Sequence, residues 1–192
     1  MTVTLFWSPK GGSGTTVAAC CFAMQQPHDR SVLVVDAASA PDVAAVFGLP
    51  SREPSTKPCD VSGNVDLLVN TSWESTEQLS KVLDAYDDVI IDAGTNPEQW
   101  VSRSDSTIVV LRACYLSLRR YMARDIDSRI SDRAVLIEEP GRALTPRDVS
   151  QVIDLPVTTI AFDPAISRTV DAGLIATRPP AAWPTLRQVL SL

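Results

Sequence analysis

Short runs rich in valine, isoleucine and leucine alternate along this chain with segments of helical period, and this alternation constrains the fold most. Most runs are apolar at consecutive positions, as expected for strands of a parallel sheet that helices cover on both faces. The pattern predicts an α/β protein with a mostly parallel central sheet of about seven strands. The expected strands are Val3–Trp7, Val32–Asp36, Asp66–Val69, Val89–Asp92, Thr107–Leu111, Ala134–Ile137 and Val157–Ala161.

Helices are expected between these strands. They are predicted at Thr15–Gln26, Pro41–Phe47, Thr76–Ala85, Glu98–Ser104, Leu116–Ser128, Pro146–Ile153 and Pro164–Ala172. Pro27 is expected to end the first helix, because proline lacks the N–H that a helix interior requires. The segment Pro50–Gly63 is rich in proline and poor in apolar residues, so it is predicted to be a surface connection.

Length and composition favour one globular domain over residues 1–192. The chain has 192 residues, of which 45% are apolar. No apolar run approaches the ~20 residues of a membrane-spanning helix, and the N-terminus lacks the layout of a signal peptide. Four cysteines without CxxC spacing and one histidine form no zinc pattern, so a cytoplasmic setting is expected. The net charge of -6 argues against DNA as a partner.

A glycine-containing turn joins the first expected strand to the first expected helix. Glycines at 11, 12 and 14 allow the backbone to bring its N–H groups close to phosphate oxygens, and the helix start adds further donors. Thr16 occupies the position of the hydroxyl that ligates magnesium in phosphate loops. However, Thr15 replaces the lysine of that pattern, and Pro9 replaces its first glycine.

The stretch "KGGSGTT", Lys10 to Thr16, resembles the deviant Walker A motif KGGxGK[ST] of the MinD/ParA superfamily. The threonine in place of the second lysine is similar to TadZ/CpaE-type proteins, which place type IVb (Flp/Tad) pilus machinery at the cell pole. Three later segments continue the resemblance in order: "VLVVDAASAPDVAAVFGL", "DDVIIDAGT" and "LPVTTIAFDPAISRTVDAG". Together these matches are more specific than the loop alone.

This resemblance implies a three-layer P-loop NTPase fold that binds ATP and Mg²⁺. It also implies a homodimer, in which Lys10 reaches across to the partner's nucleotide. A pilus or secretion ATPase, or a polar scaffold protein, is the implied further partner. Recruitment to a cell pole or membrane complex is expected, with membrane contact at most indirect.

The resemblance also implies roles for individual residues. The implied nucleotide-binding residues are Lys10, Gly11, Gly12, Ser13, Gly14, Thr15 and Thr16, with Phe162 and Asp163 near the base. The implied metal residues are Thr16 and Asp92, the implied catalytic residues are Lys10 and Asp36, and the implied switch residues are Asp36, Asp42, Asp92 and Gly94. Asp36 and Asp92 each end an apolar strand, where α/β sheets place their ligands, although an aspartate there also suits a helix cap.

The chain departs from the family pattern at catalytic positions. The first switch of the family reads D-x-D, and its second aspartate is Ala38 here. Asp42 either substitutes for that carboxylate or belongs to the first turn of the next helix. The family's base-contacting asparagine has no match between Arg133 and Leu144. Because phosphoryl transfer depends on positioned charge, losing a lysine and a carboxylate lowers turnover more than binding, leaving at most a very slow ATPase.

Three functional classes therefore compete. The first is a nucleotide-controlled dimeric localisation factor, TadZ/CpaE-like or a chromosome-partitioning or septum-site ATPase with weak hydrolysis. The second is a nucleotide-free scaffold that keeps only the fold. The third is a metabolic enzyme resembling dethiobiotin synthetase, which is disfavoured because no further catalytic constellation accompanies the loop.

Two other features, a group of arginines and the C-terminal segment, are predicted to have structural roles. The four arginines at 112, 119, 120 and 124 are predicted to form a solvated helix face in this acidic chain. The C-terminal segment Trp183–Leu192 has apolar residues at helical spacing but few cations, so it is predicted to pack on the domain or a partner rather than a membrane.

Overall fold

A computed structural model describes residues 1–69, 76–125, 130–179 and 186. The strands are β1 (Thr2–Trp7), β2 (Val32–Asp36), β3 (Cys59–Ser62), β4 (Val65–Val69), β5 (Asp88–Asp92), β6 (Ser106–Arg112), β7 (Arg133–Glu138) and β8 (Val157–Ala161). The helices are α1 (Thr15–Ala23), α2 (Val43–Val46), α3 (Thr76–Leu83), α4 (Glu98–Val101), α5 (Tyr115–Asp125), α6 (Pro146–Val152) and α7 (Pro164–Asp171).

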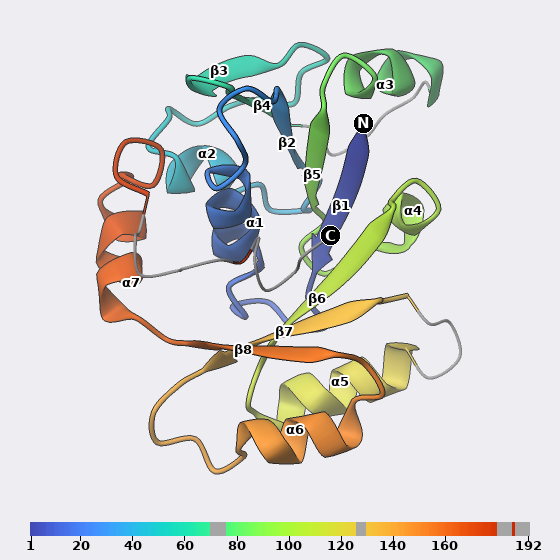
Figure 1. Ribbon diagram of the computed structural model, residues 1–192, viewed down its shortest axis with the longest axis vertical. Coiled ribbons are helices and arrows are strands. Elements are labelled where there is room, and N and C mark those ends of the chain that lie inside the picture. Colours follow the sequence, from blue (N-terminus) through green and yellow to red (C-terminus); the bar gives the residue numbers. More distant parts are fainter. Residues whose placement is uncertain (70–75, 126–129, 180–185, 187–192) are drawn as a thin grey trace.

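One sheet in the order β3-β4-β2-β5-β1-β6-β7-β8 forms the centre of the molecule (Figure 1). All of its neighbouring strands run parallel except β3, which pairs antiparallel with β4 at one edge. The predicted α/β class with a mostly parallel sheet is therefore confirmed. The connection that follows β1 leads to β2 on one side of the sheet, whereas the connection that follows its neighbour β6 leads to β7 on the other side. A crevice opens at the carboxyl ends of the strands at such a point.

Two cores, one on each face of the sheet, give the molecule three layers. On one face the buried side chains of α1 and α2, together with Ile166 of α7, pack against alternate residues of the strands. On the other face α3, α4, α5 and α6 contribute buried side chains, among them Trp100, Leu118 and Val149. Because helices cover both faces, the central strands β2 and β5 are buried at almost every position, as their apolar runs predict.

β3 is an element that the sequence analysis missed. It lies within Pro50–Gly63, which was predicted to be a surface connection, and it forms a hairpin with β4 through Gly63 and Asn64. Gly63 has a φ of 60°, a conformation that glycine adopts readily and that two-residue hairpin turns require. The Gly-Asn pair was the available signal, but β3 is a short edge strand with only half-buried or exposed side chains and carries no apolar run.

Helix starts follow local capping chemistry. Thr145 accepts a hydrogen bond from the Asp148 backbone, and the Asp148 carboxylate accepts one from the Thr145 backbone, so a capping box begins α6. Asp163 accepts from the backbone N–H of Ala165 at 2.7 Å and begins α7. None of the helices in the described ranges is long and apolar enough to cross a bilayer.

The end of one predicted helix and most of the predicted C-terminal segment lie outside the described residues. The helix predicted at Leu116–Ser128 is described only to residue 125. Of Trp183–Leu192, only Leu186 is described, and it is buried in the core on the α1 side of the sheet. The helical conformation expected for Trp183–Leu192 stays a prediction.

Candidate functional site

The glycine-containing loop between β1 and α1 is held by its own serines. The Ser8 hydroxyl donates to the carbonyl oxygen of Lys10 at 2.7 Å, and the Ser13 hydroxyl donates to the same oxygen at 2.8 Å. The backbone N–H of Ser8 donates to the carbonyl oxygen of Gly94 at 2.8 Å, which ties the loop to the segment after β5. The predicted phosphate loop and second switch are therefore adjacent.

Gly14 provides the turn from the loop into α1. Its φ is 94°, in the left-handed region that favours glycine, and Gly12 has a φ of 76°. No side chain caps the N-terminus of α1. The N–H groups of the first turn and the positive end of the helix dipole are consequently available to an anion.

Asp36 and Asp92 lie side by side at the carboxyl ends of neighbouring strands. β2 and β5 pair in a register that makes their Cα atoms direct partners, and both side chains are fully buried. One Asp92 oxygen, Oδ1, accepts from the Gly94 backbone N–H at 3.0 Å, whereas its other oxygen, Oδ2, is buried and has no hydrogen-bond partner. A buried carboxylate oxygen without a donor requires a cation or a proton.

The Asp92 environment fits a magnesium ion. Burial raises the pKa of Asp92, while hydrogen bonds from the Thr16 hydroxyl and the Gly94 backbone oppose that rise. Within the described residues no three histidine, cysteine or acidic side chains cluster as a metal site. Mg²⁺ is commonly held by one or two protein oxygens together with phosphates and waters. Thr16 and Asp92 are the residues that would hold it.

Asp36 is positioned differently from Asp92, because both of its oxygens accept backbone hydrogen bonds. Val43 N–H, at the start of α2, donates to Oδ2 at 2.9 Å, and Ala38 N–H donates to Oδ1 at 3.4 Å. Burial raises the pKa of Asp36 to about 7, although these backbone donors oppose the rise. Through these hydrogen bonds Asp36 holds the first switch to the start of α2. Its predicted catalytic role stays a prediction.

Asp42 is the exposed carboxylate of the first switch. It precedes α2 but makes no side-chain capping bond, and the first N–H of α2, that of Val43, donates to Asp36. Instead Asp42 lines the same cavity as the phosphate loop, near enough to Asp36 and Asp92 to raise the pKa of each. Asp42 therefore lies both at the start of α2 and in the cavity wall, so its two predicted roles, as the substitute carboxylate or as a residue of the helix start, both stay predictions.

A cavity of about 460 Å³ lies over the loop and both switches. Its lining includes most of the residues that the sequence placed at the phosphates and switches, namely Lys10, Gly11, Gly12, Gly14, Thr15, Thr16, Asp42 and Gly94. Ala38, the position of the missing carboxylate, also lines it. Asp36 and Asp92 are buried and are not part of its lining, and Ser13 instead lines a neighbouring pocket.

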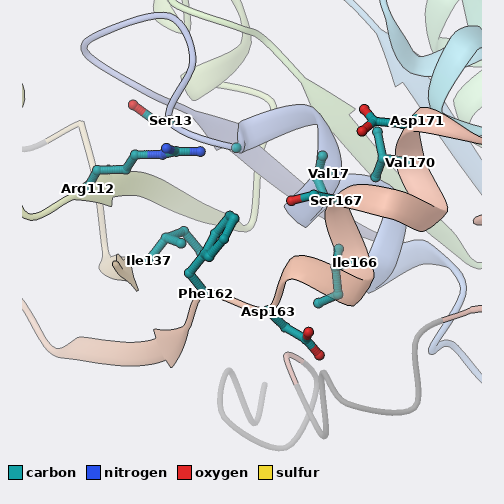
Figure 2. A pocket seen from close by; sticks show the side chains of 11 residues that line it. Ser13, Val17, Arg112, Ile137, Phe162, Asp163, Ile166, Ser167, Val170 and Asp171 are labelled. Atoms are coloured by element: carbon teal, nitrogen blue, oxygen red, sulfur yellow. The ribbon is translucent and has the colours of Figure 1, made fainter. Parts of the chain in front are cut away.

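That neighbouring pocket, of about 150 Å³, shares Gly14 and Val17 with the cavity and contains Phe162 and Asp163 (Figure 2). Figure 2 shows Phe162 across the pocket from Val170 of α7. Its lining is mostly apolar, as expected for a site that takes a flat ring. The two residues predicted near a base are thus brought to the phosphate loop.

Arg112 is a site residue that sequence reasoning misplaced. It was predicted on a solvated helix face, but it ends β6, lines the pocket of Phe162 and forms an ion pair with Glu139. Its buried Nε has no hydrogen-bond partner. Arg119 and Arg120 are exposed on α5, as predicted, whereas Arg124 donates to the Thr95 carbonyl oxygen at 2.5 Å and lies 6.0 Å from the centre of the Trp7 ring.

Neither a protein-family model nor a curated protein matches the chain in sequence. Solved structures do match in fold. A ParA family ATPase from Chlorobium tepidum TLS has a TM-score of 0.71 and 21% identity, covering 91% of this chain and 90% of its own. The MinC:MinD cell division protein complex of Aquifex aeolicus gives 0.72 and 18%, covering 90% and 86%. The chain has the ParA/MinD fold.

A third ParA/MinD-fold structure was solved with a nucleotide analogue. A plasmid partition protein from Borrelia burgdorferi B31 bound to AMPPNP has a TM-score of 0.66 and 16% identity, with 90% of each chain covered. At these identities the likeness establishes the fold alone.

Stability of the ligand-free ParA/MinD-fold domain is expected to fall as pH rises through about 7. The raised pKa of Asp36 means that the folded state holds a proton more tightly than the unfolded state, so this stabilisation is present below the unfolded pKa and lost above the folded pKa. Asp36→Asn keeps an acceptor for Val43 N–H and removes the titration. We expect the loss of stability between pH 5 and pH 8 to shrink by about 2 to 3 kcal/mol, measured by urea unfolding.

The matched control for this prediction is Asp84→Asn, which removes an exposed carboxylate outside the site. It is expected to leave the pH dependence of unfolding unchanged. A pH dependence that is the same in the wild type and Asp36→Asn would show that Asp36 does not ionise in this range.

Gly94→Ala is expected to strain the contact between the two switches. A methyl group at Gly94 would lie 3.0 Å from the Ala38 Cβ, and the φ of 55° already disfavours alanine. Gly63 has a similar φ of 60° with no atom near the same position, so Gly63→Ala reports the backbone cost alone. We expect Gly94→Ala to lose about 1 to 2 kcal/mol more than Gly63→Ala in denaturant unfolding. Equal losses would mean that the two switches do not pack in solution.

Proposed function

We propose that this chain binds ATP with Mg²⁺ and acts as a nucleotide-controlled, dimeric localisation or assembly factor that hydrolyses ATP very slowly. One observation carries the proposal. Asp92 accepts a hydrogen bond from Thr16 and still keeps its buried Oδ2 without a partner, and Thr16 belongs to α1, whose N-terminus has no side-chain cap after the glycine-rich loop. An anion above the loop and a divalent cation beside Thr16 would satisfy both unmatched groups.

Within this proposal each part of the site binds one part of the nucleotide. The backbone donors of the loop and of the first turn of α1 bind the phosphates, while Thr16 and Asp92 hold the cation that balances their charge. The pocket of Phe162 is next to the loop and is apolar enough for the base. Arg112 and Asp163 supply polar groups at its wall.

Slow turnover is proposed because two groups that act on the reaction are missing from the cavity wall. Thr15 and Ala38 both line the cavity and are nearly buried, so no lysine and no aspartate project from these two positions. Backbone donors stabilise bound phosphate, whereas a positioned cation and carboxylate chiefly stabilise the transition state. A long-lived ATP state suits a protein that marks a location.

The more specific role rests on sequence resemblance. The Thr15 substitution is similar to TadZ/CpaE-type proteins, and we include in the proposal a pilus or secretion ATPase, or a polar scaffold protein, as partner. The Aquifex structure holds MinD together with MinC, which shows that this fold supports such an assembly in that protein. A scaffold without nucleotide is the competing function, and the presence together of Lys10, the loop glycines, Thr16 and Asp92 disfavours it.

Lys10 supports the dimer part of the proposal. It is half-buried at the edge of the cavity, its Nζ donates to the Gly11 carbonyl oxygen at 3.2 Å, and within the described ranges it pairs with no carboxylate. Such a cation is available to a nucleotide on a facing subunit, and in a two-fold dimer both sites gain it together.

Lys10→Ala is therefore expected to weaken ATP-dependent dimerisation by at least about tenfold, a loss of ~1.4 kcal/mol. Light scattering with and without AMPPNP and Mg²⁺ measures it. Lys57→Ala, which removes an exposed lysine away from the cavity, is the control and should dimerise normally. A Lys10→Ala protein that dimerises like the wild type would remove the cross-subunit role.

A further inference from the structure

Helix α5 presents an apolar face to solvent. Tyr115 is 72% exposed, Leu116 42% and Met122 41%. Among the described residues few large hydrophobic side chains are this exposed, and three of them lie on this one helix. The opposite side of α5 is fixed to the domain, because Leu118 and Tyr121 are buried in the core. Exposed apolar side chains that gather in one place commonly mark a binding surface.

Two arginines complete this face. Arg119 and Arg120 are exposed and follow Tyr115 and Leu116 by one helical turn, with Met122 one turn further. Side chains three or four residues apart lie on the same side of a helix, so the face reads apolar, basic, apolar along its length. Neither arginine forms an ion pair in the part of the chain that the structure describes.

The positive charge of this face indicates the kind of partner that binds it. Arg119 and Arg120 are exposed between apolar side chains and have no ion-pair partner among the described residues, so this face is complementary to a surface that is both apolar and acidic. We propose that the exposed face of α5 (Tyr115, Leu116, Arg119, Arg120 and Met122) binds an acidic amphipathic helix of a partner protein. Leucine-like side chains of that helix would cover Tyr115, Leu116 and Met122, with its carboxylates beside the arginines.

A membrane fits this face less well. Insertion requires a broad apolar face, but here the two arginines divide the exposed apolar side chains, and Leu118 and Tyr121 on the other side of α5 are buried in the core. A second copy of the chain also fits less well, because a two-fold contact between two copies of this face would bring like-charged arginines together.

The test uses the purified chain without nucleotide, so its outcome is separate from that of the proposed ATP site. The probe is a labelled helical peptide with leucines at i, i+4 and i+7 flanked by glutamates, and the reference peptide has lysines in place of the glutamates. Fluorescence anisotropy is expected to show tighter binding of the acidic peptide by at least about tenfold.

Variants then locate the binding. Arg119→Glu with Arg120→Glu, and separately Leu116→Ser with Met122→Ser, are each expected to weaken acidic-peptide binding at least about tenfold. Arg52→Glu with Arg147→Glu changes the net charge equally at exposed sites outside α5 and should keep it. Equal affinity for both peptides, or equal loss in the control variant, would overturn the proposal. So would α5-dependent binding to anionic vesicles, or α5-dependent self-association, in the absence of acidic-peptide binding.

Discussion

Gly14→Val is expected to abolish nucleotide binding, with affinity for AMPPNP and Mg²⁺ reduced at least about a hundredfold, a loss of ~2.7 kcal/mol or more. Gly14 lines both the loop cavity and the pocket of Phe162, so a branched side chain there would stand where the two meet. Its φ of 94° also disfavours a branched residue, which would shift the loop and the start of α1. Isothermal titration calorimetry measures the affinity.

Gly11→Ala is the matched control for that result. Gly11 belongs to the same cavity, but a methyl group there meets no atom within 4 Å, and its φ is not in the left-handed region. Its affinity should stay within about threefold of the wild type. Circular dichroism melting establishes whether each variant is folded. A folded Gly14→Val protein that binds AMPPNP like the wild type would show that the nucleotide lies elsewhere.

The double change Thr15→Lys with Ala38→Asp is expected to raise ATP turnover by about a hundredfold or more. It restores a cation and a carboxylate to two positions that line the same cavity, where each acts on charge that develops during phosphoryl transfer. Because the two groups act on the same transition state, we expect the double variant to exceed the product of the single effects. Steady-state phosphate release under saturating ATP measures turnover.

The control for this double variant tests whether the position of the added carboxylate matters. Thr15→Lys with Ser39→Asp adds the same charges, but the carboxylate comes from the exposed neighbour of Ala38, which lines the same cavity. It should not raise turnover. If the double variant with Asp at 38 binds ATP normally and still releases phosphate no faster, the missing groups are not what limits the reaction.

The fold was largely predictable because its signals are local. Consecutive apolar residues in β2 and β5 indicate burial on both faces, and the proline and glycine positions bound several helices. β3 escaped prediction for the same reason, since it depends on pairing with β4 rather than on a hydrophobic run. Its turn residues, Gly63 and Asn64, were the local signal that remained.

The site was predictable at the loop and less so around it. The glycines of the loop predicted an unusual backbone, and Gly12 and Gly14 have left-handed conformations. The aspartates that end two apolar strands were predicted at the sheet edge, and Asp36 and Asp92 are partners there. What the two aspartates bond to depends on tertiary contacts. Asp36 bonds the start of α2, whereas Asp92 leaves one oxygen unmatched. No spacing in the sequence distinguishes these two environments.

The environment of Arg112 also depends on tertiary contacts that the sequence does not show. In the sequence it is one of several arginines near a predicted helix, yet it ends β6 and reaches a pocket formed with Phe162, fifty residues later in the chain. Glu139, its ion-pair partner, directly follows the neighbouring strand β7. Only the order of strands in the sheet brings these residues together.

The fate of bound ATP tests the central claim most directly. Purified protein is incubated with ATP and Mg²⁺, separated from free nucleotide, and the bound nucleotide is identified by mass spectrometry over several hours. We predict that the protein holds about one ATP per chain and that this ATP stays intact far longer in the wild type than in Thr15→Lys with Ala38→Asp. Rapid conversion to ADP by the wild type, or no bound nucleotide at millimolar ATP, would contradict the account.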